Sequence, residues 1–287
     1  MLQTHFKKAH PPKIASTSHS TVKWRCALIL LTTCLTVGFT TGCGSQKPQD
    51  PAGFACNSNH IIGGQVLAPR SALTSNTVGV RGKNFICSGT LIARDLVLTA
   101  AHCVDRAGMA VEFGASPSCD PNSSAVHVTG VRVSNYNETA DTDRNDIALL
   151  KLARPAPTGF DPAPIATTDM EGDLKTNSVL IVAGFGQAHT GLPSATPLDG
   201  YLRETNVSVW DYQFGQTEFL VYQGDGHGAC YGDSGGPAFL LREQKYYLLG
   251  VASRGDEECR LNGVYAKVPE FRSWLAQAAT SLGSTLP

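Results

Sequence analysis

The sequence lacks a hydrophobic run long enough to cross a bilayer, a C-x-x-C pair and a basic patch interleaved with aromatic residues. Its most apolar stretch begins at Cys26 and fades by about Phe39, which is shorter than a stable transmembrane helix needs. The cysteines beyond Cys43 lie at least 16 residues apart, so a structural zinc site is not expected. From Ile61 onward, 17 Lys and Arg face 23 Asp and Glu, an acidic balance that argues against nucleic-acid binding.

The first 60 residues are predicted to lie outside the folded domain. Lys23 and Arg25 precede the apolar stretch, an order that is typical of a secretory signal. We therefore expect a signal peptide over residues 1–42. Residues 43–60, which are rich in proline and small polar side chains, are expected to form a tether or pro-segment.

The end of this signal is similar to a bacterial lipobox. The sequence there is Thr-Thr-Gly-Cys and ends at Cys43, with Thr40 where leucine is usual. We expect Cys43 to be lipidated and to attach the protein to a membrane in the cell envelope. An ordinary secreted protein and an uncleaved anchor are the alternatives.

Short β-branched and apolar runs dominate the chain from Val78 onward, separated by clusters of Gly, Pro, Asn and Asp. They cover residues 91–92, 96–99, 126–128, 147–152, 179–182 and 246–251. Helical spacing appears only near the end, where Phe271, Trp274 and Leu275 share one face. The pattern predicts an all-β fold of barrels with one C-terminal α-helix.

A Gly-x-Ser-x-Gly pattern is centred on Ser234, within Gly-Asp-Ser-Gly-Gly-Pro. Flanking glycines allow a sharp bend that exposes the hydroxyl, although in a chain with 29 glycines this pattern alone is equally consistent with a turn. A serine nucleophile needs a base. His102 within Thr-Ala-Ala-His-Cys offers one, and Asp146 offers a carboxylate at the start of an apolar run.

These three segments, together with Ile-Ile-Gly-Gly at residues 61–64, resemble the chymotrypsin/trypsin family of serine proteases in content and order. The resemblance extends from Ile61 almost to the C-terminus, so we expect one protease domain over residues 61–287. It implies two six-stranded antiparallel β-barrels with the active site between them. The proline-rich residues 155–168 would form the crossover.

The resemblance also implies the catalytic roles. Ser234 would be the nucleophile, His102 its general base and Asp146 the group that orients the imidazole and stabilises its charged form. The backbone N–H groups of Gly232 and Ser234 would form the oxyanion hole. The order His, Asp, Ser excludes a lipase or esterase, in which the serine comes first.

Activation is expected to follow the family's zymogen mechanism. Cleavage of the His60–Ile61 bond would free an amine on Ile61, which would pair with Asp233 and shape the oxyanion hole. An unpartnered buried carboxylate is unfavourable, which makes the new ammonium an effective switch. His60 departs from the usual Arg or Lys, so the activating protease stays open.

The resemblance implies a substrate pocket without charge. Its expected residues are Gly228, Ala229, Ser253, Gly255 and Gly263. Six residues before Ser234, trypsin carries an aspartate and this chain carries Gly228, which predicts large apolar or aromatic substrate side chains instead of Arg or Lys. Arg254 stands where the family has a tryptophan. Three acids at 256–258 either attract basic groups elsewhere in a substrate or form a solvated turn.

Disulfide pairing is likewise implied by the resemblance, since spacing alone leaves it open. The expected pairs are Cys87–Cys103 and Cys230–Cys259, which leaves Cys56 and Cys119 to each other. We expect an exported monomer that acts on proteins or peptides and needs neither a metal nor an organic cofactor. The alternative function is that of a non-catalytic binding domain that kept the protease fold. Arg254 favours this alternative, since its side chain could obstruct a substrate.

Overall fold

The computed structural model describes residues 61–68, 71–117, 123–186 and 201–287. The predicted signal peptide and tether, with Cys43 and Cys56, lie outside these residues, as does Cys119. No helix within the described ranges is long and apolar enough to cross a membrane.

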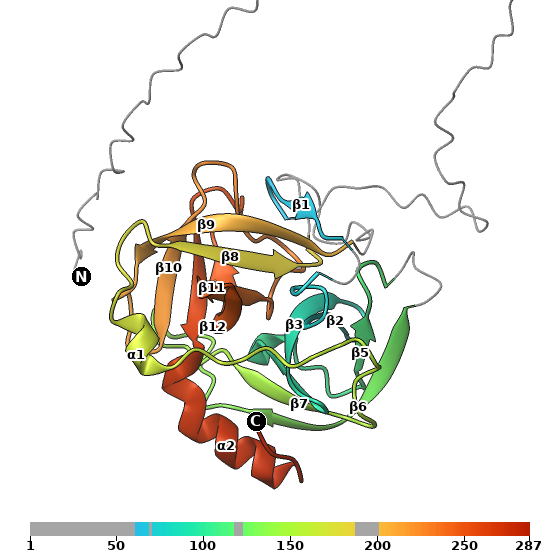
Figure 1. Ribbon diagram of the computed structural model, residues 1–287. Helices are drawn as coiled ribbons and strands as arrows, with labels where there is room; N and C mark the ends of the chain where they lie inside the picture. The colour runs from blue at the N-terminus through green and yellow to red at the C-terminus, as the bar shows by residue number, and fades with distance from the viewer. Residues whose placement is uncertain (1–60, 69–70, 118–122, 187–200) are drawn as a thin grey trace, which may run out of the picture. The chain divides into compact units, whose positions relative to one another are not determined.

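The first half of the domain is a closed antiparallel barrel with the strand order β2-β3-β4-β7-β6-β5 (Figure 1). Its strands are β2 (Thr77–Arg81), β3 (Ile86–Ala93), β4 (Leu96–Thr99), β5 (Ala110–Phe113), β6 (Ser124–Val133) and β7 (Ala148–Leu152). Neighbours in sequence pair as hairpins except where β4 pairs with β7 and β2 with β5. These two pairings close the barrel.

The second half is another antiparallel barrel, in the order β9-β10-β13-β12-β11-β8, closed by pairing of β8 with β9. Its strands are β8 (Val179–Gly184), β9 (Arg203–Asp211), β10 (Glu218–Tyr222), β11 (Pro237–Arg242), β12 (Lys245–Gly255) and β13 (Asn262–Lys267). A short strand, β1 (Gln65–Val66), pairs with β9 from outside. The predicted fold of two six-stranded barrels is confirmed.

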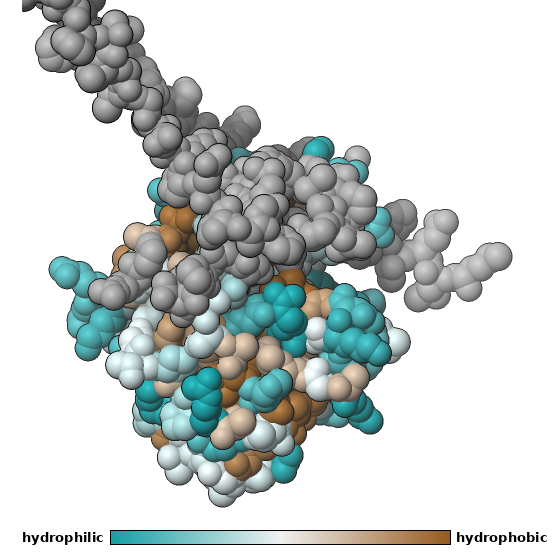
Figure 2. Space-filling model, turned by 90° about the vertical axis from the view of Figure 1, so that its right-hand side faces the viewer, coloured by the Kyte–Doolittle hydropathy of each residue, from teal (hydrophilic) through white to brown (hydrophobic). Residues whose placement is uncertain are grey.

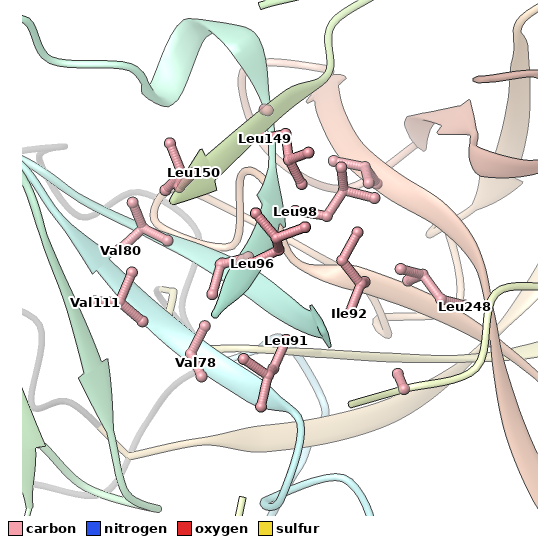
Figure 3. Packing of buried hydrophobic residues seen from close by; sticks show 14 of the residues in the cluster. Val78, Val80, Leu91, Ile92, Leu96, Leu98, Val111, Leu149, Leu150 and Leu248 are labelled. Atoms are coloured by element: carbon pink, nitrogen blue, oxygen red, sulfur yellow. The ribbon is translucent and has the colours of Figure 1, made fainter. Parts of the chain in front are cut away.

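Apolar side chains fill each barrel because strand residues alternate between the interior and the outside. The first interior contains Val78, Val80, Leu91 and Val111, which lie close together in Figure 3 and are each fully buried. Leu248 of the second barrel belongs to the same apolar cluster. The two barrels therefore share part of one core.

The connections also join the barrels. Residues 153–167 lead from the first barrel to the short helix α1 (Thr168–Glu171) and then to β8, where the prolines predicted a crossover. A 3₁₀-turn (Val268–Phe271) follows β13 and leads into helix α2 (Arg272–Ser281). Leu275 of α2 is buried in the cluster shared by the barrels, and Arg132 of β6 donates a hydrogen bond to Ser281 Oγ at 2.8 Å. Thus α2 ends against the first barrel.

The outer surface is mixed. On the face seen in Figure 2, apolar residues (brown) interleave with polar ones (teal and white) over the described part of the chain. Strand β11 illustrates the alternation that produces this surface, since Leu240 is 5% exposed whereas Leu241 is 47% exposed. Leu240 packs in a cluster with Leu180 of the paired strand β8.

We predict that Leu240→Ala lowers the free energy of unfolding by about 2–4 kcal/mol, because it removes buried methyl groups and leaves a cavity. Leu241→Ala is the matched control on the same strand and is expected to change it by less than about 0.5–1 kcal/mol. Urea unfolding followed by tryptophan fluorescence measures both. Equal losses in the two variants would contradict the assigned strand orientation.

Candidate active site

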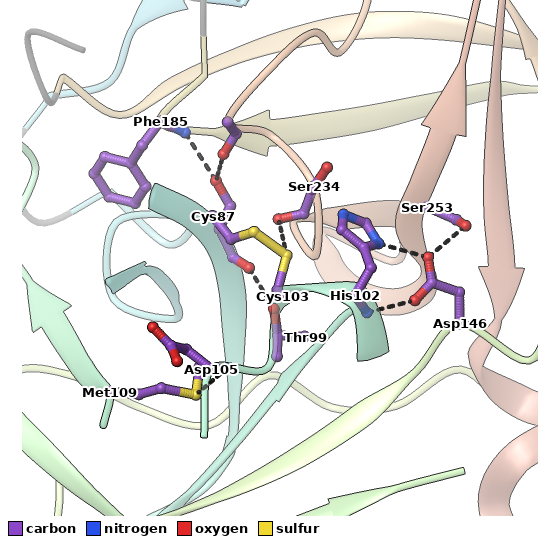
Figure 4. Close-up of a disulfide and its surroundings, with 12 residues drawn as sticks. Cys87, Thr99, His102, Cys103, Asp105, Met109, Asp146, Phe185, Ser234 and Ser253 are labelled. Atoms are coloured by element: carbon purple, nitrogen blue, oxygen red, sulfur yellow. Dashed lines mark hydrogen bonds and ion pairs between the residues drawn. A yellow bond between two sulfur atoms is a disulfide. The ribbon is translucent and has the colours of Figure 1, made fainter. Parts of the chain in front are cut away.

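His102 and Asp146 lie together because β4 and β7 are paired. Thr99 at the end of β4 faces Ala148 at the start of β7. His102 follows β4 in a 3₁₀-turn (Ala101–Cys103), and Asp146 precedes β7 by two residues. The His102 Nδ1 atom is 2.7 Å from Asp146 Oδ2, and the His102 backbone N–H donates to Oδ1 at 3.0 Å (Figure 4). The carboxylate thus holds both the ring and the backbone of the histidine.

The Asp146 carboxylate is buried, with only 2% of its side chain exposed. Ser253 of the second barrel donates its hydroxyl to Oδ2 at 2.7 Å. Burial raises the pKa of Asp146, but the hydrogen bond and charge interaction with His102 and the hydrogen bond from Ser253 outweigh burial, so the pKa falls below its usual range. The group is therefore a carboxylate at neutral pH.

Ser234 lies on the loop that precedes β11, and two glycines give this loop its shape. Gly232 and Gly235 have φ of 96° and 80°, in the left-handed region that other residues avoid. A Cβ atom on Gly235 would lie 2.1 Å from Thr99 Oγ1 and 2.4 Å from the Ser88 carbonyl oxygen. The close approach to the first barrel therefore requires glycine.

Ser88 of β3 holds the same loop against the first barrel. Its N–H donates to the Ser234 carbonyl at 2.8 Å, and its hydroxyl donates to the Gly232 carbonyl at 3.0 Å. Ser88 is fully buried. The nucleophile loop of one barrel is thus positioned by the backbone and the side chain of one residue of the other. The sequence did not predict this contact, because Ser88 lies in no recognisable motif.

The His102 ring lies beside Ser234, with its second nitrogen on the side of the serine (Figure 4). Both residues line one cavity. Among the described residues, no hydrogen bond joins the Ser234 hydroxyl to His102. Such contacts commonly tighten only when substrate is bound.

Two backbone N–H groups of the serine loop have no hydrogen-bond acceptor among the described residues. In the described part of the chain, the N–H groups of Gly232 and Ser234 donate no hydrogen bond, whereas that of Asp233 donates to Cys230 and that of Gly235 donates to Ala252. Unused N–H groups next to a cavity are suited to bind a developing oxyanion.

Both disulfides implied by the resemblance are present in the described residues. Cys87 and Cys103 are bonded, with their Cα atoms 6.2 Å apart, and fix the 3₁₀-turn that holds His102 to β3. Cys230 and Cys259 are bonded, with their Cα atoms 5.4 Å apart, and connect the serine loop with the segment after β12.

Asp233 and Ile61 are both buried, each about 1% exposed. The Asp233 carboxylate accepts hydrogen bonds from the N–H groups of Gly186 at 2.7 Å and Cys230 at 2.9 Å. Ile62 pairs with Gly228 through two backbone hydrogen bonds of 3.1 Å. The segment that begins at Ile61 is therefore seated on the wall of the serine loop.

The cavity beside Ser234 has a volume of about 340 Å³. Of the expected pocket residues, Ala229, Ser253, Gly255 and Gly263 line it, and Gly228 does not. A Cβ atom on Gly228 would lie 2.3 Å from Gln223 Cδ, so the Gln223 side chain covers Gly228. This corrects the expectation that Gly228 itself faces the substrate.

Gln223 lines the cavity in front of Gly228, and three hydrogen bonds orient its carboxamide. Its Nε2 donates to the carbonyls of Ala229 at 3.1 Å and Cys259 at 3.4 Å, and its Oε1 accepts the N–H of Ala229 at 3.1 Å. The Tyr265 hydroxyl, also on the cavity wall, is buried without a partner among the described residues. The pocket is therefore uncharged at its base but more polar than the glycines suggested. Gln223 lies outside every motif, so no sequence signal marked it.

The acids at 256–258 were expected either to attract basic groups of a substrate or to form a solvated turn, and they differ in their surroundings. Asp256 accepts backbone N–H groups from Arg260, Leu261 and Asn262 at 2.8–3.0 Å. Burial raises the pKa of Asp256, but these backbone hydrogen bonds outweigh burial and lower it. Asp256 thus organises a turn, while the side chain of Glu257 is exposed at the rim of the cavity.

Cys87, His102 and Cys103 are close enough together to suggest a metal site. The two sulfur atoms form a disulfide, however, and a metal ligand would have to be a thiolate. This cluster is therefore not suited to a metal ion.

A sequence profile of the trypsin family matches residues 61–275. The chain belongs to the trypsin family. Among solved structures, it is similar to neuropsin, a serine protease expressed in the limbic system of mouse brain, with a TM-score of 0.62 and 22% sequence identity. The match covers 75% of this chain and 97% of that chain. As a trypsin-family protein, the chain is a serine endopeptidase, a hydrolase whose substrates are proteins or peptides.

Proposed function

We propose that this trypsin-family enzyme cleaves peptide bonds with Ser234 as nucleophile, His102 as general base and Asp146 as the orienting carboxylate. The observation that supports the proposal most strongly is the 2.7 Å contact between His102 Nδ1 and a buried Asp146 carboxylate, beside a cavity that His102 and Ser234 both line. This contact favours a proton on Nδ1, which leaves Nε2 free to accept the serine proton.

The reaction follows from these positions. The Ser234 Oγ attacks the carbonyl carbon of the substrate while His102 Nε2 takes the hydroxyl proton, and the N–H groups of Gly232 and Ser234 bind the oxyanion. The intermediate collapses to an acyl-enzyme as His102 gives the proton to the leaving amine. Water, deprotonated by His102, then attacks the ester carbonyl; the ester bond breaks as His102 returns the proton to Ser234 Oγ, which releases the acid product. Asp146 remains ionised throughout, in line with its lowered pKa.

Activation is proposed to follow cleavage of the His60–Ile61 bond. The burial of Ile61 and the pairing of Ile62 with Gly228 support a terminus that docks beside the serine loop. The freed ammonium would pair with the Asp233 carboxylate, which also accepts the N–H groups of Cys230 in that loop and of Gly186 after β8.

Substrate preference is proposed to favour large apolar or aromatic side chains at P1, the residue whose carbonyl is attacked. The neutral Gln223 carboxamide covers Gly228, at the position where trypsin carries its selecting aspartate. A floor without a carboxylate gives no compensation for burying the charge of Lys or Arg. The aliphatic and aromatic parts of Ala229, Ala252 and Tyr265 line the walls.

Export is proposed from the signal over residues 1–42, with lipidation of Cys43 as the means of membrane attachment. The two disulfides support an oxidising compartment, where such bonds persist. The proposed form is a monomer, with a third disulfide between Cys56 and Cys119.

We predict that Ser234→Ala abolishes labelling by a fluorophosphonate probe and lowers peptide hydrolysis by about 10³-fold or more, because the nucleophile is removed. Ser281→Ala on α2 is the control and should label like the wild type. Probe fluorescence on a gel and a peptide cleavage assay measure the two effects. Unchanged labelling of Ser234→Ala would refute this nucleophile.

The active form is predicted to begin with Ile61-Ile62-Gly63-Gly64, because only cleavage before Ile61 frees an amine that can reach Asp233. Edman sequencing of fluorophosphonate-labelled protein tests this. Full activity in a chain still joined at His60 would contradict the proposed switch.

Gln223→Glu is predicted to raise cleavage after Lys and Arg relative to Phe by about tenfold, because it places a carboxylate on the pocket floor. Gln277→Glu on the exposed face of α2 is the matched control and should leave the ratio unchanged. Paired peptide substrates that differ only at P1 give the ratio. An active Gln223→Glu variant with the wild-type ratio would show that P1 is selected elsewhere.

A further inference from the structure

A fully buried carboxylate lies near the site without belonging to any motif. Glu218 at the start of β10 has no exposed side-chain surface, and its two oxygens accept the Arg254 guanidinium at 2.6 and 2.9 Å. They also accept the backbone N–H groups of Asp143 at 2.9 Å and Arg144 at 3.2 Å. Each oxygen receives two donors, which fills the capacity of a carboxylate.

The backbone that Glu218 binds leads directly to Asp146. Residues 134–147 connect β6 with β7 in the first barrel, whereas Glu218 and Arg254 belong to the second. Asp143 and Asn145 have φ of 55° and 54°, in the left-handed region that is uncommon outside glycine but that Asp and Asn adopt more readily than other residues. Contacts with the second barrel add to the hydrogen bonds within the segment that hold these torsions.

Thr217, next to Glu218, supplies more of these partners. Its N–H and hydroxyl both donate to Asp143 Oδ1, at 2.6 and 3.0 Å. The Arg254 guanidinium also donates to the Asp141 carbonyl at 2.9 Å. The second barrel thus contacts the segment before Asp146 through both the backbone and the side chains of the segment.

Arg254 follows Ser253, whose hydroxyl holds the Asp146 carboxylate itself at 2.7 Å. Two consecutive residues of β12 therefore act on Asp146, one on its side chain and one, through Glu218, on the backbone that precedes it. We propose that Glu218 and Arg254 are positioning residues that hold residues 141–146 against the second barrel and so keep the Asp146 carboxylate within hydrogen-bond distance of His102. This inference rests on the proposed function of that triad.

The same contacts fix the position of the Arg254 side chain at the cavity. The guanidinium forms a two-pronged pair with Glu218, and only 20% of the Arg254 side chain is exposed. Its charge is matched by that carboxylate, so Arg254 lines the cavity without acting as a free cation for an acidic substrate.

The test is Glu218→Gln in the full-length protein, matured in parallel with the wild type. The amide keeps the size of the side chain but turns two acceptor positions into donors that face other donors. On an acetylated single-residue ester, which fills only the P1 pocket, we expect kcat to fall at least tenfold while KM stays within threefold. The rate of fluorophosphonate labelling at Ser234 should fall in parallel.

The matched control is Glu112→Gln, which breaks a guanidinium–carboxylate pair with Arg81 between β2 and β5, within the first barrel. It should leave kcat and KM within twofold of the wild type. A kcat for Glu218→Gln within twofold of the wild type, even with a lower Tm, would reduce the pair to a structural contact and overturn the inference. A raised KM with unchanged kcat would also overturn it.

Arg254→Lys provides a second reading if Glu218→Gln does not fold. Lysine keeps the positive charge but cannot donate two parallel hydrogen bonds to Glu218, so kcat is expected to fall about threefold or more. An unchanged kcat in a folded Arg254→Lys enzyme contradicts the inference. Wild-type protein that resists fluorophosphonate contradicts the proposed function and this inference with it. Labelling of the wild type and Glu218→Gln at equal rates contradicts this inference alone.

Discussion

The site depends on keeping one carboxylate ionised inside the protein. Asp146 is almost completely buried, and a buried charge without partners is strongly unfavourable. Its oxygens receive the ring and backbone of His102 from the first barrel and the hydroxyl of Ser253 from the second. The carboxylate can therefore be both buried and charged only when the barrels are docked, which couples assembly of the fold to assembly of the site.

The nucleophile loop of the second barrel is likewise held by residues of the first barrel. Ser234 belongs to the second barrel, but its carbonyl is held by Ser88 of the first, and Gly235 packs against the end of β4 where no side chain would fit. Hydrogen bonds thus cross the interface from each barrel to the other. Because the first-barrel cluster also includes Leu248 and the buried face of α2, the docking is supported by apolar packing as well. This packing and the hydrogen bonds together hold the loops of His102 and Ser234 against each other.

The sequence predicted those features that local patterns encode. Short apolar and β-branched runs predicted an all-β fold of barrels. The resemblance carried by the segments around His102 and Ser234 implied two six-stranded barrels and a trypsin-family serine endopeptidase, which the strand order and the family match confirm. What it did not predict depends on how side chains pack in the folded chain. Gln223 covers Gly228 because its carboxamide turns back onto Ala229, with which it forms two hydrogen bonds, and Glu218 looks like an ordinary surface acid until its burial is known. Such roles arise from packing and leave no pattern along the chain.

The most direct test of the account is an NMR measurement of the proton between His102 and Asp146, made with ¹⁵N-labelled histidine. The account predicts a far-downfield proton bonded to His102 Nδ1 that exchanges slowly with solvent and disappears in Asp146→Asn. A wild-type His102 without a proton on Nδ1, or a resonance that persists unchanged in Asp146→Asn, would contradict it.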